Sequence, residues 1–344
     1  MKILIAGLGS IGQRHARNLR TLCGPRVELL AFRERGLSHV ITDAMAVDTS
    51  RSVETALGIR SFVSLGEALN ERPDAVFVCN PTSRHMAVAT AAVAAGCHVF
   101  LEKPVSDSDA GLDALIYAAA QRGIVVAVGY QLRAHPLMVR ARALLEASTL
   151  GRVISMRAEM GEYLPAAHPY ENYRISYAAR RDLGGGVLLC FAHEFDYLQW
   201  WLGNPRTVFA AGGNSGQLDV DVEDIALTTV IFERDGIRVP AQVHHSFVQR
   251  PPVRGAQVVG ENGRMDIDLV KSSIRVVDAH GRTVCDDVMP CERNDLFLYE
   301  LRAFLDAVSG RGAPLVSLAE GAVSLRIALA ARRSLASGQA EVLA

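Results

Sequence analysis

Residues 2–12 read Lys-Ile-Leu-Ile-Ala-Gly-Leu-Gly-Ser-Ile-Gly, an apolar run that passes directly into a glycine-rich stretch. The apolar run over residues 2–7 predicts a buried strand, and the pattern over residues 10–22 predicts a helix. The stretch between them has the spacing GxGxxG. A strand, a glycine turn and a helix in this order begin a βαβ unit, so these residues decide the class of fold.

The glycine turn predicts a binding site for the diphosphate of a dinucleotide. Gly7, Gly9 and Gly12 permit a tight turn, a close approach of backbone to diphosphate, and close packing of helix on strand. Ser10 and Ile11 lie at the start of the helix, where free N–H groups attract anions. A glycine-rich turn without a ligand is the alternative, but the position between strand and helix favours the dinucleotide.

Short apolar runs and helical patterns alternate through the first third of the chain. Further strands are predicted over residues 27–33, 75–79, 98–101 and 124–128, and helices over residues 82–95 and 108–122. Near-continuous apolar strands that alternate with helices are typical of a parallel sheet covered on both faces. We therefore expect an α/β, doubly wound Rossmann domain, which binds the dinucleotide and spans residues 1–125.

The pattern changes after about Gly129, where many strand-like segments alternate apolar and polar residues. Strands are predicted over residues 153–163, 207–212, 225–233, 237–247, 257–259 and 264–269, and helices over residues 134–146, 187–202, 295–309 and 318–336. Such alternation is expected of an antiparallel sheet with one exposed face. We expect an α+β domain over residues 126–344 with a large open, mostly antiparallel sheet. Because its flat face needs covering, this substrate-binding domain is also expected to form a homodimer or homotetramer.

The composition argues against several classes of protein. The 344 residues carry 36 basic and 37 acidic side chains, so no basic excess attracts nucleic acid or an anionic membrane. The longest apolar run, residues 87–101, is too short to span a bilayer, and the apolar N-terminus has no cleavage site. The six cysteines form no CxxC pair, which indicates neither disulfides nor a zinc site. A cytoplasmic protein without a metal is expected.

The end of the second predicted strand bears on the choice between NAD and NADP. An acidic side chain at this place binds the ribose hydroxyls of NAD, whereas arginine suits the extra phosphate of NADP. The sequence here is Arg33-Glu34-Arg35. We expect Arg33 and Arg35 to contact the cofactor and NADP to be slightly favoured, while Glu34 keeps NAD possible. The alternative is that all three are solvated surface charges.

Several short motifs are typical of one known family. They are GLGSIGQRH at residues 7–15, NPTSRH at 80–85, Glu102-Lys103-Pro104 and GENGRMDID at 260–268, with an aromatic-bearing helix near Phe297. In this combination the chain resembles, over almost its whole length, the glucose–fructose oxidoreductase and inositol dehydrogenase (Gfo/Idh/MocA) family. The resemblance implies a nicotinamide-dependent enzyme acting on a sugar-like or polyol-like substrate. It also implies cofactor contacts from Asn80, Pro81, Thr82, His85, Glu102 and Lys103.

The resemblance further implies that Lys103 lies beside the nicotinamide and the reacting carbon–oxygen group. Oxidation of an alcohol removes its proton as the hydride leaves, so a base with a pKa near neutrality is wanted. Burial and a nearby oxidised nicotinamide would both lower the pKa of a lysine toward that range. Pro104 favours an extended backbone at Lys103, and Glu102 is expected to orient the site. An exposed loop lysine is the alternative.

One position departs from the family pattern. Members of the family usually carry a glycine run, then an Asp, then a His four residues later on one helix face. After the run at residues 184–186, this chain has Cys190 at the Asp position and Glu194 at the His position, with His193 one residue earlier. Either Glu194 replaces the histidine, or the helix start is shifted and His193 keeps the role, which we favour. A packed or surface histidine is the alternative.

The loop before the glycine run is rich in aromatic and basic side chains, as substrate-recognition loops often are. Substrate contacts are expected from Tyr163, His168, Tyr173 and Arg180, and from Gln131 and Arg133 after the last strand of the first domain. Tyr and Arg can stack on sugar rings or bind carboxylate and phosphate, so an anionic sugar is one hypothesis. A structural loop or an oligomer contact is the alternative.

These patterns predict an NAD(P)-dependent oxidoreductase that moves a hydride between nicotinamide and the hydroxyl or carbonyl carbon of a sugar, sugar acid or polyol. Lys103 is its expected general acid/base, assisted by His193 or Glu194. A cofactor-retaining enzyme of the glycosidase or dehydratase type is one alternative, and a non-catalytic dinucleotide-binding sensor is another. The intact Glu102-Lys103-Pro104 argues against a sensor, whereas Cys190 argues for it.

Overall fold

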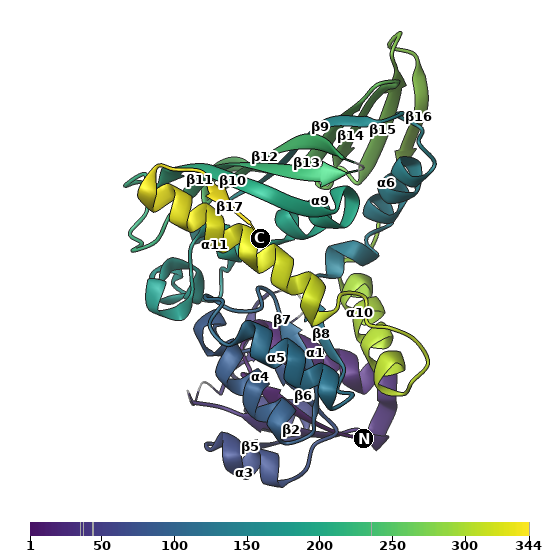
Figure 1. Ribbon diagram of the computed structural model, residues 1–344. Coiled ribbons are helices and arrows are strands. Elements are labelled where there is room, and N and C mark those ends of the chain that lie inside the picture. The colour runs from purple at the N-terminus through teal and green to yellow at the C-terminus, as the bar shows by residue number, and fades with distance from the viewer. Residues whose placement is uncertain (35, 37, 43–44, 235, 344) are drawn as a thin grey trace.

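The computed structural model describes every residue except 35, 37, 43, 44, 235 and 344. Figure 1 shows an α/β domain that carries the N-terminus and a second domain built on a large, curved sheet. Between them runs the long helix α11 (Leu318–Ser337), which lies along the sheet on the side that faces the first domain.

The first domain is built on a six-stranded sheet in the order β5-β2-β1-β6-β7-β8. Its strands are β1 (Lys2–Ala6), β2 (Glu28–Phe32), β5 (Ile59–Phe62), β6 (Ala75–Val78), β7 (His98–Glu102) and β8 (Val126–Gly129). All neighbouring strands are parallel. The strand order reverses its direction between β1 and β6, which makes this edge the place where such sheets bind ligands. The expected doubly wound sheet is confirmed.

Helices cover both faces of this sheet, and therefore its central strands are apolar throughout. Residues Ile3 to Ala6 of β1 are completely buried. α4 (His85–Ala94) and α5 (Leu112–Gln121) pack on one face, and α1 (Ser10–Cys23) and α10 (Arg293–Val308) pack on the other. Smaller elements complete the domain: β3 (Val40–Ile41), β4 (Val47–Asp48), α2 (Val53–Leu57) and α3 (Leu65–Asn70).

The chain crosses between the two domains more than once. The expected boundary at residue 125 falls before β8, although β8 pairs with β7 in the first sheet. Much later in the sequence, α10 returns to the first domain, where the Phe304 ring contacts the rings of Phe77 and Phe100. Residues more than 200 positions apart in the sequence, such as Phe77 and Phe304, therefore pack in one core.

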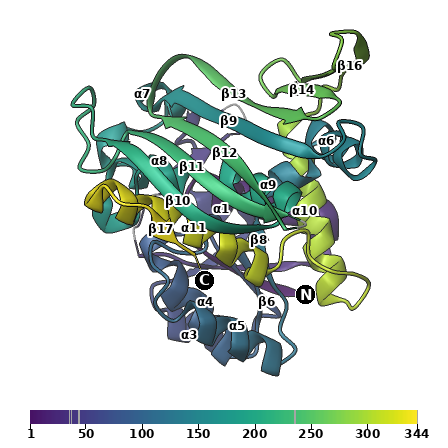
Figure 2. The same ribbon diagram turned by 45° about the horizontal axis from the view of Figure 1, so that its top comes forward.

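The second domain contains a nine-stranded sheet in the order β16-β15-β14-β13-β9-β12-β11-β10-β17, seen obliquely in Figure 2. Its strands are β9 (Val153–Tyr163), β10 (Asn204–Gly213), β11 (Ile225–Arg234), β12 (Ile237–Ser246), β13 (Val248–Gly260), β14 (Gly263–Asp268), β15 (Ser273–Asp278), β16 (Thr283–Val288) and β17 (Glu341–Val342). β9 and β12 are parallel, and the other neighbours are antiparallel. The expected mostly antiparallel sheet is confirmed.

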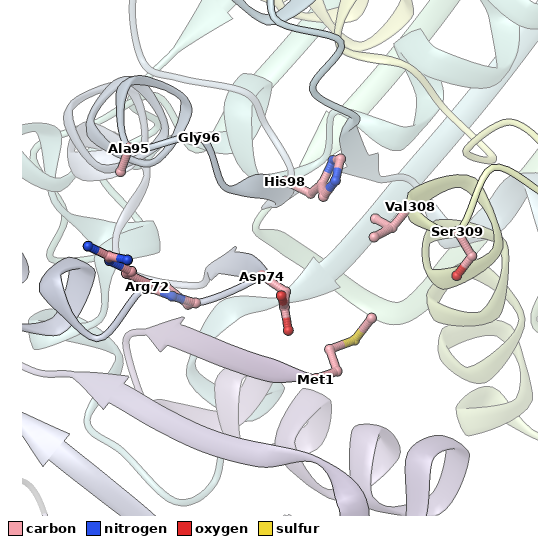
Figure 3. Close-up of a pocket in the computed structure, with 9 residues that line it drawn as sticks. Met1, Arg72, Asp74, Ala95, Gly96, His98, Val308 and Ser309 are labelled. Atoms are coloured by element: carbon pink, nitrogen blue, oxygen red, sulfur yellow. The ribbon is translucent and has the colours of Figure 1, made fainter.

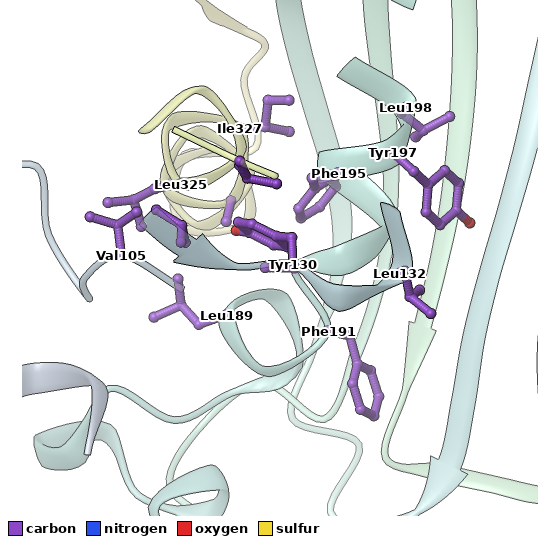
Figure 4. Packing of buried hydrophobic residues seen from close by; sticks show 14 of the residues in the cluster. Val105, Tyr130, Leu132, Leu189, Phe191, Phe195, Tyr197, Leu198, Leu325 and Ile327 are labelled. Atoms are coloured by element: carbon purple, nitrogen blue, oxygen red, sulfur yellow. The ribbon is translucent and has the colours of Figure 1, made fainter. Parts of the chain in front are cut away.

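Helices cover one face of this sheet and leave the other open. The covering helices include α9 (His193–Leu202) and α11, and Figure 4 shows the Tyr130 ring among Leu189, Phe195 and Leu325 in the core beneath the sheet. Phe209 and Leu227 lie next to buried residues of their strands and are each 44% exposed, so they face away from these helices. α6 (Pro136–Glu146) and α7 (Leu164–Ala167) complete the domain.

The helix expected over residues 187–202 is interrupted. α8 (Val187–Cys190) ends after one turn, and α9 begins at His193. Phe191, between them, has φ −102° and ψ 40°, which departs from helical geometry. Because of this break, Cys190 and His193 belong to two separate helices.

Among the described residues, no helix is both long and apolar enough to cross a membrane.

Candidate functional site

The glycine turn after β1 is shaped to receive a ligand. A Cβ atom on Gly7 would lie 2.8 Å from the backbone nitrogen of Asn80, and one on Gly12 would lie 2.0 Å from the carbonyl oxygen of Gly7. These two glycines are needed so that β1, β6 and α1 can pack together. A Cβ on Gly9, in contrast, would meet nothing within 4 Å. Open space therefore lies in front of Gly9, where the diphosphate is expected.

The N-terminus of α1 faces that space without a side-chain cap. Gly9 is the N-cap residue and provides no side-chain hydrogen bond to the first turn. The first N–H groups of a helix have no partner inside the helix, so those of Ser10 and Ile11 can bind an anion. The turn thus fits the diphosphate of a dinucleotide in both shape and charge.

The loop after β6 lies beside the glycine turn and includes an unpartnered amide. Asn80 Oδ1 is buried without a hydrogen-bond partner, and its backbone nitrogen is the atom closest to Gly7. A buried acceptor normally has a donor, and a cofactor hydroxyl would supply one here. Pro81 and Thr82 continue this loop.

His85 has a different role from the cofactor contact that we expected. Its ring is 2% exposed. Nδ1 lies 2.9 Å from the carbonyl oxygen of Pro104, and Nε2 lies 2.9 Å from that of Asn80. Burial lowers the pKa of His85. The ring therefore ties the loop after β6 to the loop after β7 and presents no nitrogen to a ligand.

At the end of β2 the arginine expected to select NADP is already paired. The Arg33 guanidinium donates to the Glu54 carboxylate, and its side chain is 9% exposed. Glu34, the next residue, is exposed. Arg35 lies outside the described residues.

Lys103 follows β7 at the same carboxyl edge of the sheet. Its Nζ donates a hydrogen bond to the backbone carbonyl of Cys190, 2.7 Å away. Burial lowers the pKa of Lys103, which the nearby Glu102 carboxylate partly opposes. Glu102 Oε1 lies 2.6 Å from Nε2 of the buried His15. Lys103 is thus a half-buried amine at the carboxyl edge of the sheet and not an exposed loop lysine.

The helix break explains why Cys190 can accept from Lys103. α8 ends at Cys190, and the last carbonyl groups of a helix have no partner within it. Burial raises the pKa of the Cys190 thiol to about 11, so the side chain stays neutral at physiological pH. At the position where the resemblance implies an Asp, this chain has Cys190, and it offers Lys103 a main-chain carbonyl.

His193 is the first residue of α9, and the charge of Lys103 helps to lower its pKa. Its side chain is buried against the Tyr130 ring, and Nδ1 has no hydrogen-bond partner. Its pKa is held well below the usual value by burial and then by the charges of Arg254, Lys103 and Arg293. A neutral imidazole with a free nitrogen can donate to or accept from a substrate.

Glu194 is instead engaged in the core. It is completely buried, its Oε1 lies 3.0 Å from the Arg254 guanidinium, and its Oε2 lies 3.7 Å from Nε2 of His245. Arg254 is the main reason why the pKa of Glu194 is lowered despite burial. Of the two candidates left open by the sequence, Glu194 is paired with Arg254, whereas His193 keeps a ring nitrogen without a partner.

Four other residues were expected to contact the substrate. Burial lowers the pKa of His168, followed by the charges of Arg293 and Lys103, and its Nδ1 has no partner. Tyr163, at the end of β9, lies under the Arg250 guanidinium. Gln131 is half-buried in the turn after β8. The Tyr173 hydroxyl accepts a hydrogen bond from the Asp219 backbone at 3.3 Å.

Two residues that were expected to contact the substrate are instead paired with carboxylates of the protein. Arg133 is buried, donates to both oxygens of Asp196 at 2.9 and 2.8 Å, and donates to Glu320 at 2.6 Å. It joins three segments of the core and has no surface for a substrate. Arg180 is exposed and forms a two-pronged ion pair with Asp182.

The sequence reasoning missed three charged groups of the site. Arg254 on β13 and Arg293 at the start of α10 both act on the pKa of His193. Glu162 on β9 has its pKa raised by burial, opposed by Arg254, Lys103 and Arg293. Each residue lies in a segment with no motif, so its spacing carried no signal.

A separate hollow lies at the opposite edge of the first sheet. It has a volume of about 630 Å³ and is lined by residues that include Met1, Asp74 and His98, at the amino ends of β1, β6 and β7 (Figure 3). Parallel sheets bind ligands at their carboxyl edge, so this hollow is not the candidate site. No group of three metal-binding side chains occurs among the described residues.

A Rossmann sheet, an uncapped helix N-terminus and a half-buried lysine at the same edge of the sheet are typical of a dinucleotide-dependent oxidoreductase. Residues 1–130 match the oxidoreductase family model with an NAD-binding Rossmann fold, and residues 138–266 match the Gfo/Idh/MocA C-terminal domain. The chain therefore belongs to the Gfo/Idh/MocA family, as its motifs indicated.

Named relatives span nearly the whole chain. A myo-inositol 2-dehydrogenase of Thermotoga maritima is 27% identical, covering 97% of this chain and 96% of its own length. A 1,5-anhydro-D-fructose reductase of Ensifer adhaerens is 28% identical, covering 90% and 92%. The solved structure of GenD2, from gentamicin A biosynthesis, in complex with NAD is 26% identical with a TM-score of 0.78, covering 100% of this chain and 96% of that one.

Proposed function

We propose that this protein transfers a hydride between the nicotinamide of a bound dinucleotide and a CH–OH carbon of a sugar, sugar acid or polyol. The observation that carries the proposal is Lys103, a half-buried amine at the carboxyl edge of the Rossmann sheet, held by the Cys190 carbonyl at 2.7 Å. The names of the relatives support the choice of a sugar-like or polyol-like substrate.

In this proposal the residues of the chain position the cofactor and the substrate and transfer the hydroxyl proton of the substrate. The N-terminus of α1 binds the diphosphate, and Asn80 Oδ1 accepts from a cofactor hydroxyl. Lys103, in its neutral form, removes the hydroxyl proton of the substrate, and in the reverse direction its ammonium returns it. His193 binds a substrate oxygen through its free nitrogen. The bound dinucleotide supplies the hydride acceptor or donor.

We propose NAD rather than NADP as the preferred cofactor, which revises our expectation from the sequence. The pairing of Arg33 with Glu54 occupies one of the two guanidiniums that were expected to bind an additional phosphate. The exposed Glu34 is left to bind ribose hydroxyls and repels a phosphate. The ratio of the two dissociation constants, measured by calorimetry, tests this choice: a tighter complex with NADP contradicts it.

The substrate class follows from the charges beside Lys103. After burial, Arg254 and Arg293 both help to lower the pKa of His193; Arg254 is paired with Glu194, and Arg293 adds a further positive charge. A carboxylate on the substrate would be stabilised by such charges. A sugar acid such as D-glucuronate is therefore expected to be a better substrate than its neutral analogue.

A cofactor-retaining enzyme is the second candidate, favoured by one contact. Burial raises the pKa of Tyr170, in a loop of the second domain, and Ser10 at the N-terminus of α1 opposes that rise, so the two side chains are neighbours. This loop would close over a bound diphosphate and slow its release. A dinucleotide that remains bound through many catalytic cycles, with no net reduction of added NAD, would support the second candidate over the first.

The proposal is tested by combining binding with turnover. Purified wild type and Lys103→Ala are titrated with NAD by calorimetry and then assayed at 340 nm with myo-inositol, D-xylose and D-glucuronate. We expect both proteins to bind NAD and only the wild type to reduce it. Binding without reduction of NAD by any substrate favours the cofactor-retaining enzyme or a sensor, and absence of binding contradicts the proposal.

We also propose a homodimer or homotetramer in the cytoplasm, formed through the open sheet face that exposes Phe209 and Leu227. Light scattering on the wild type and on Phe209→Glu tests this, since a charge at the interface should release monomers. The dinucleotide domain is proposed to comprise residues 1–130 together with α10.

A further inference from the structure

Arg332 and Glu223 hold the N-terminus of α8 from outside that helix. The Arg332 guanidinium, on α11, donates to the Glu223 carboxylate at 3.2 Å and to the backbone carbonyl of Gly185. Glu223 in turn accepts from the first turn of α8: its backbone carbonyl from Val187 at 3.0 Å, and its carboxylate from Leu188 at 3.4 Å. A residue distant in the sequence therefore caps α8.

Gly186 makes room for this ion pair. It is the N-cap residue of α8, and it has a φ of 101° and no side chain that could cap the helix. A Cβ at this position would lie 2.7 Å from Nη2 of Arg332 and would collide with Oε1 of Glu223. The two charged side chains occupy the place that a capping side chain would take. They are only 24% and 10% exposed, so each charge depends on the other.

The helix that carries Arg332 also packs on the domain that carries Lys103. A Cβ on Gly321 of α11 would lie 2.7 Å from Cγ2 of Val128, on β8, and 3.2 Å from Cγ2 of Val105. Val105 follows Lys103 by two residues. The first part of α11 is thus packed against the first domain, while Arg332, three turns further on, contacts the glycine run.

The other end of α8 holds the lysine of the proposed reaction. α8 has a single turn, and a helix so short is not stable by itself. Its last residue, Cys190, accepts from Lys103 Nζ at 2.7 Å, a bond that a displacement of about 1 Å would break. We propose that Arg332 is a positioning residue, which aligns α8 so that the Cys190 carbonyl fixes the Lys103 amine. This inference rests on the proposed function.

Loss of this alignment should act on the chemical step. A misplacement of about 1 Å can lower a rate about a hundredfold, so we expect Arg332→Ala to lower kcat about tenfold to a hundredfold, with unchanged NAD affinity. Kinetics use NAD with the most rapidly oxidised of myo-inositol, D-xylose and D-glucuronate, and calorimetry measures NAD binding. The control is Arg333→Ala on the same helix, where an exposed arginine pairs with Glu341. It should match the wild type.

A titration of Lys103 tests the alignment without any substrate. The chain has three lysines, Lys2, Lys103 and Lys271, so NMR of protein with ¹³C-labelled lysine follows each amine, and Lys103→Met assigns the signal. A hydrogen bond to an ammonium favours its charged form. Loss of the Cys190 carbonyl should therefore lower the pKa of Lys103 in Arg332→Ala. Removal of the Arg332 charge alone would raise that pKa, because a like charge disfavours the ammonium.

Added guanidinium should restore what Arg332→Ala loses. Glu223 and Arg332 line a hollow of about 230 Å³ that is open to solvent, so the ion can reach the Glu223 carboxylate. Millimolar guanidinium should raise kcat of Arg332→Ala and return the pKa of Lys103 toward the wild-type value, with no effect on Arg333→Ala. Arg332→Lys keeps the charge but lacks the fork that reaches Gly185. If Arg332→Ala does not fold, Arg332→Lys should show the same changes in smaller measure.

Two results would overturn the inference. One is a pKa of Lys103 in Arg332→Ala that equals or exceeds the value in Arg333→Ala. The other is a loss of activity that follows losses of melting temperature and NAD affinity and that guanidinium does not reverse, since that indicates a structural role alone. The proposed function fails separately: a wild type that oxidises none of the three probes, or an active Lys103→Met, contradicts it, whereas the titration still reports how Lys103 is held.

Discussion

Lys103 donates its hydrogen bond to the main-chain carbonyl of Cys190, and not to a side chain. The contact exists because α8 ends at Cys190, which leaves that carbonyl without a helical partner. A carbonyl orients the amine without adding a full negative charge. Lys103 is thus held in position while burial still lowers its pKa.

Replacing Cys190 by Asp should move the pH dependence of catalysis. A carboxylate beside the ammonium favours the charged form and raises the pKa of Lys103 by roughly 1 unit or more. Alcohol oxidation requires neutral Lys103, so its kcat/KM rises with pH through that pKa. The rise should therefore shift to higher pH in Cys190→Asp. A pH profile that coincides with that of the remote control Cys285→Asp would contradict this view of the site.

Gly9 and Gly12 should respond differently to alanine. The φ of −73° at Gly9 suits any residue, and a Cβ there meets nothing in the free protein. Gly9→Ala should keep the wild-type melting temperature and bind NAD at least tenfold more weakly, because the methyl group occupies the diphosphate space. Gly12→Ala should be destabilised, since its Cβ would collide with the Gly7 carbonyl. Calorimetry and thermal unfolding of both variants measure these effects. Normal NAD binding by Gly9→Ala would contradict the assigned cradle.

Substitution of His193 should lower the catalytic rate, whereas substitution of Glu194 should lower the stability of the fold. His193→Ala removes a neutral hydrogen-bonding group at the substrate and should lower kcat/KM by about tenfold to a hundredfold. Glu194→Gln leaves Arg254 without its carboxylate and should lower the free energy of unfolding by about 3 kcal/mol. Kinetics and denaturant unfolding of both variants test the assignment. The opposite pattern would restore Glu194 as the substrate-facing residue.

Arg133 should matter for folding and not for substrate choice. Asp196→Asn removes the carboxylate to which Nε and Nη2 of Arg133 donate, and breaking such a buried pair costs about 3–5 kcal/mol. We expect a large loss of stability in urea unfolding, with the ratio of kcat/KM values for D-glucuronate and D-xylose unchanged at a temperature where the variant is folded. A changed ratio would return Arg133 to the substrate site.

Local signals explain why the first domain could be predicted from the sequence. β1, the glycine turn and α1 are contiguous, and the apolar strands are buried on both faces. β13 was less accessible to prediction: only residues 257–259 were expected, but the strand spans Val248–Gly260. Pro251 and Pro252 hid its beginning, and the register of pairing with β9 shifts there. Prolines are tolerated at such irregularities.

The site could be predicted only where it is carried by motifs. Lys103 was identified because Glu102-Lys103-Pro104 ends a strand of the sheet. No glycine or proline marks the helix break at Phe191. The sequence alone therefore could not show that Glu194 is buried in an ion pair with Arg254 while His193 is not. Arg133 is polar in the sequence but buried in the fold, because its partners Asp196 and Glu320 come from distant segments. Arg254 and Arg293 reach the site by tertiary packing alone.

The most direct test of Lys103 as the acid/base is the rate of hydride transfer in a single turnover. Wild type and Lys103→Met, each saturated with NAD, are mixed with the best substrate in a stopped-flow instrument, and reduced nicotinamide is followed by its absorbance. The account predicts equal NAD binding and a rate lowered by roughly 10²–10⁴-fold in the variant. Hydride transfer at the wild-type rate in Lys103→Met would contradict it.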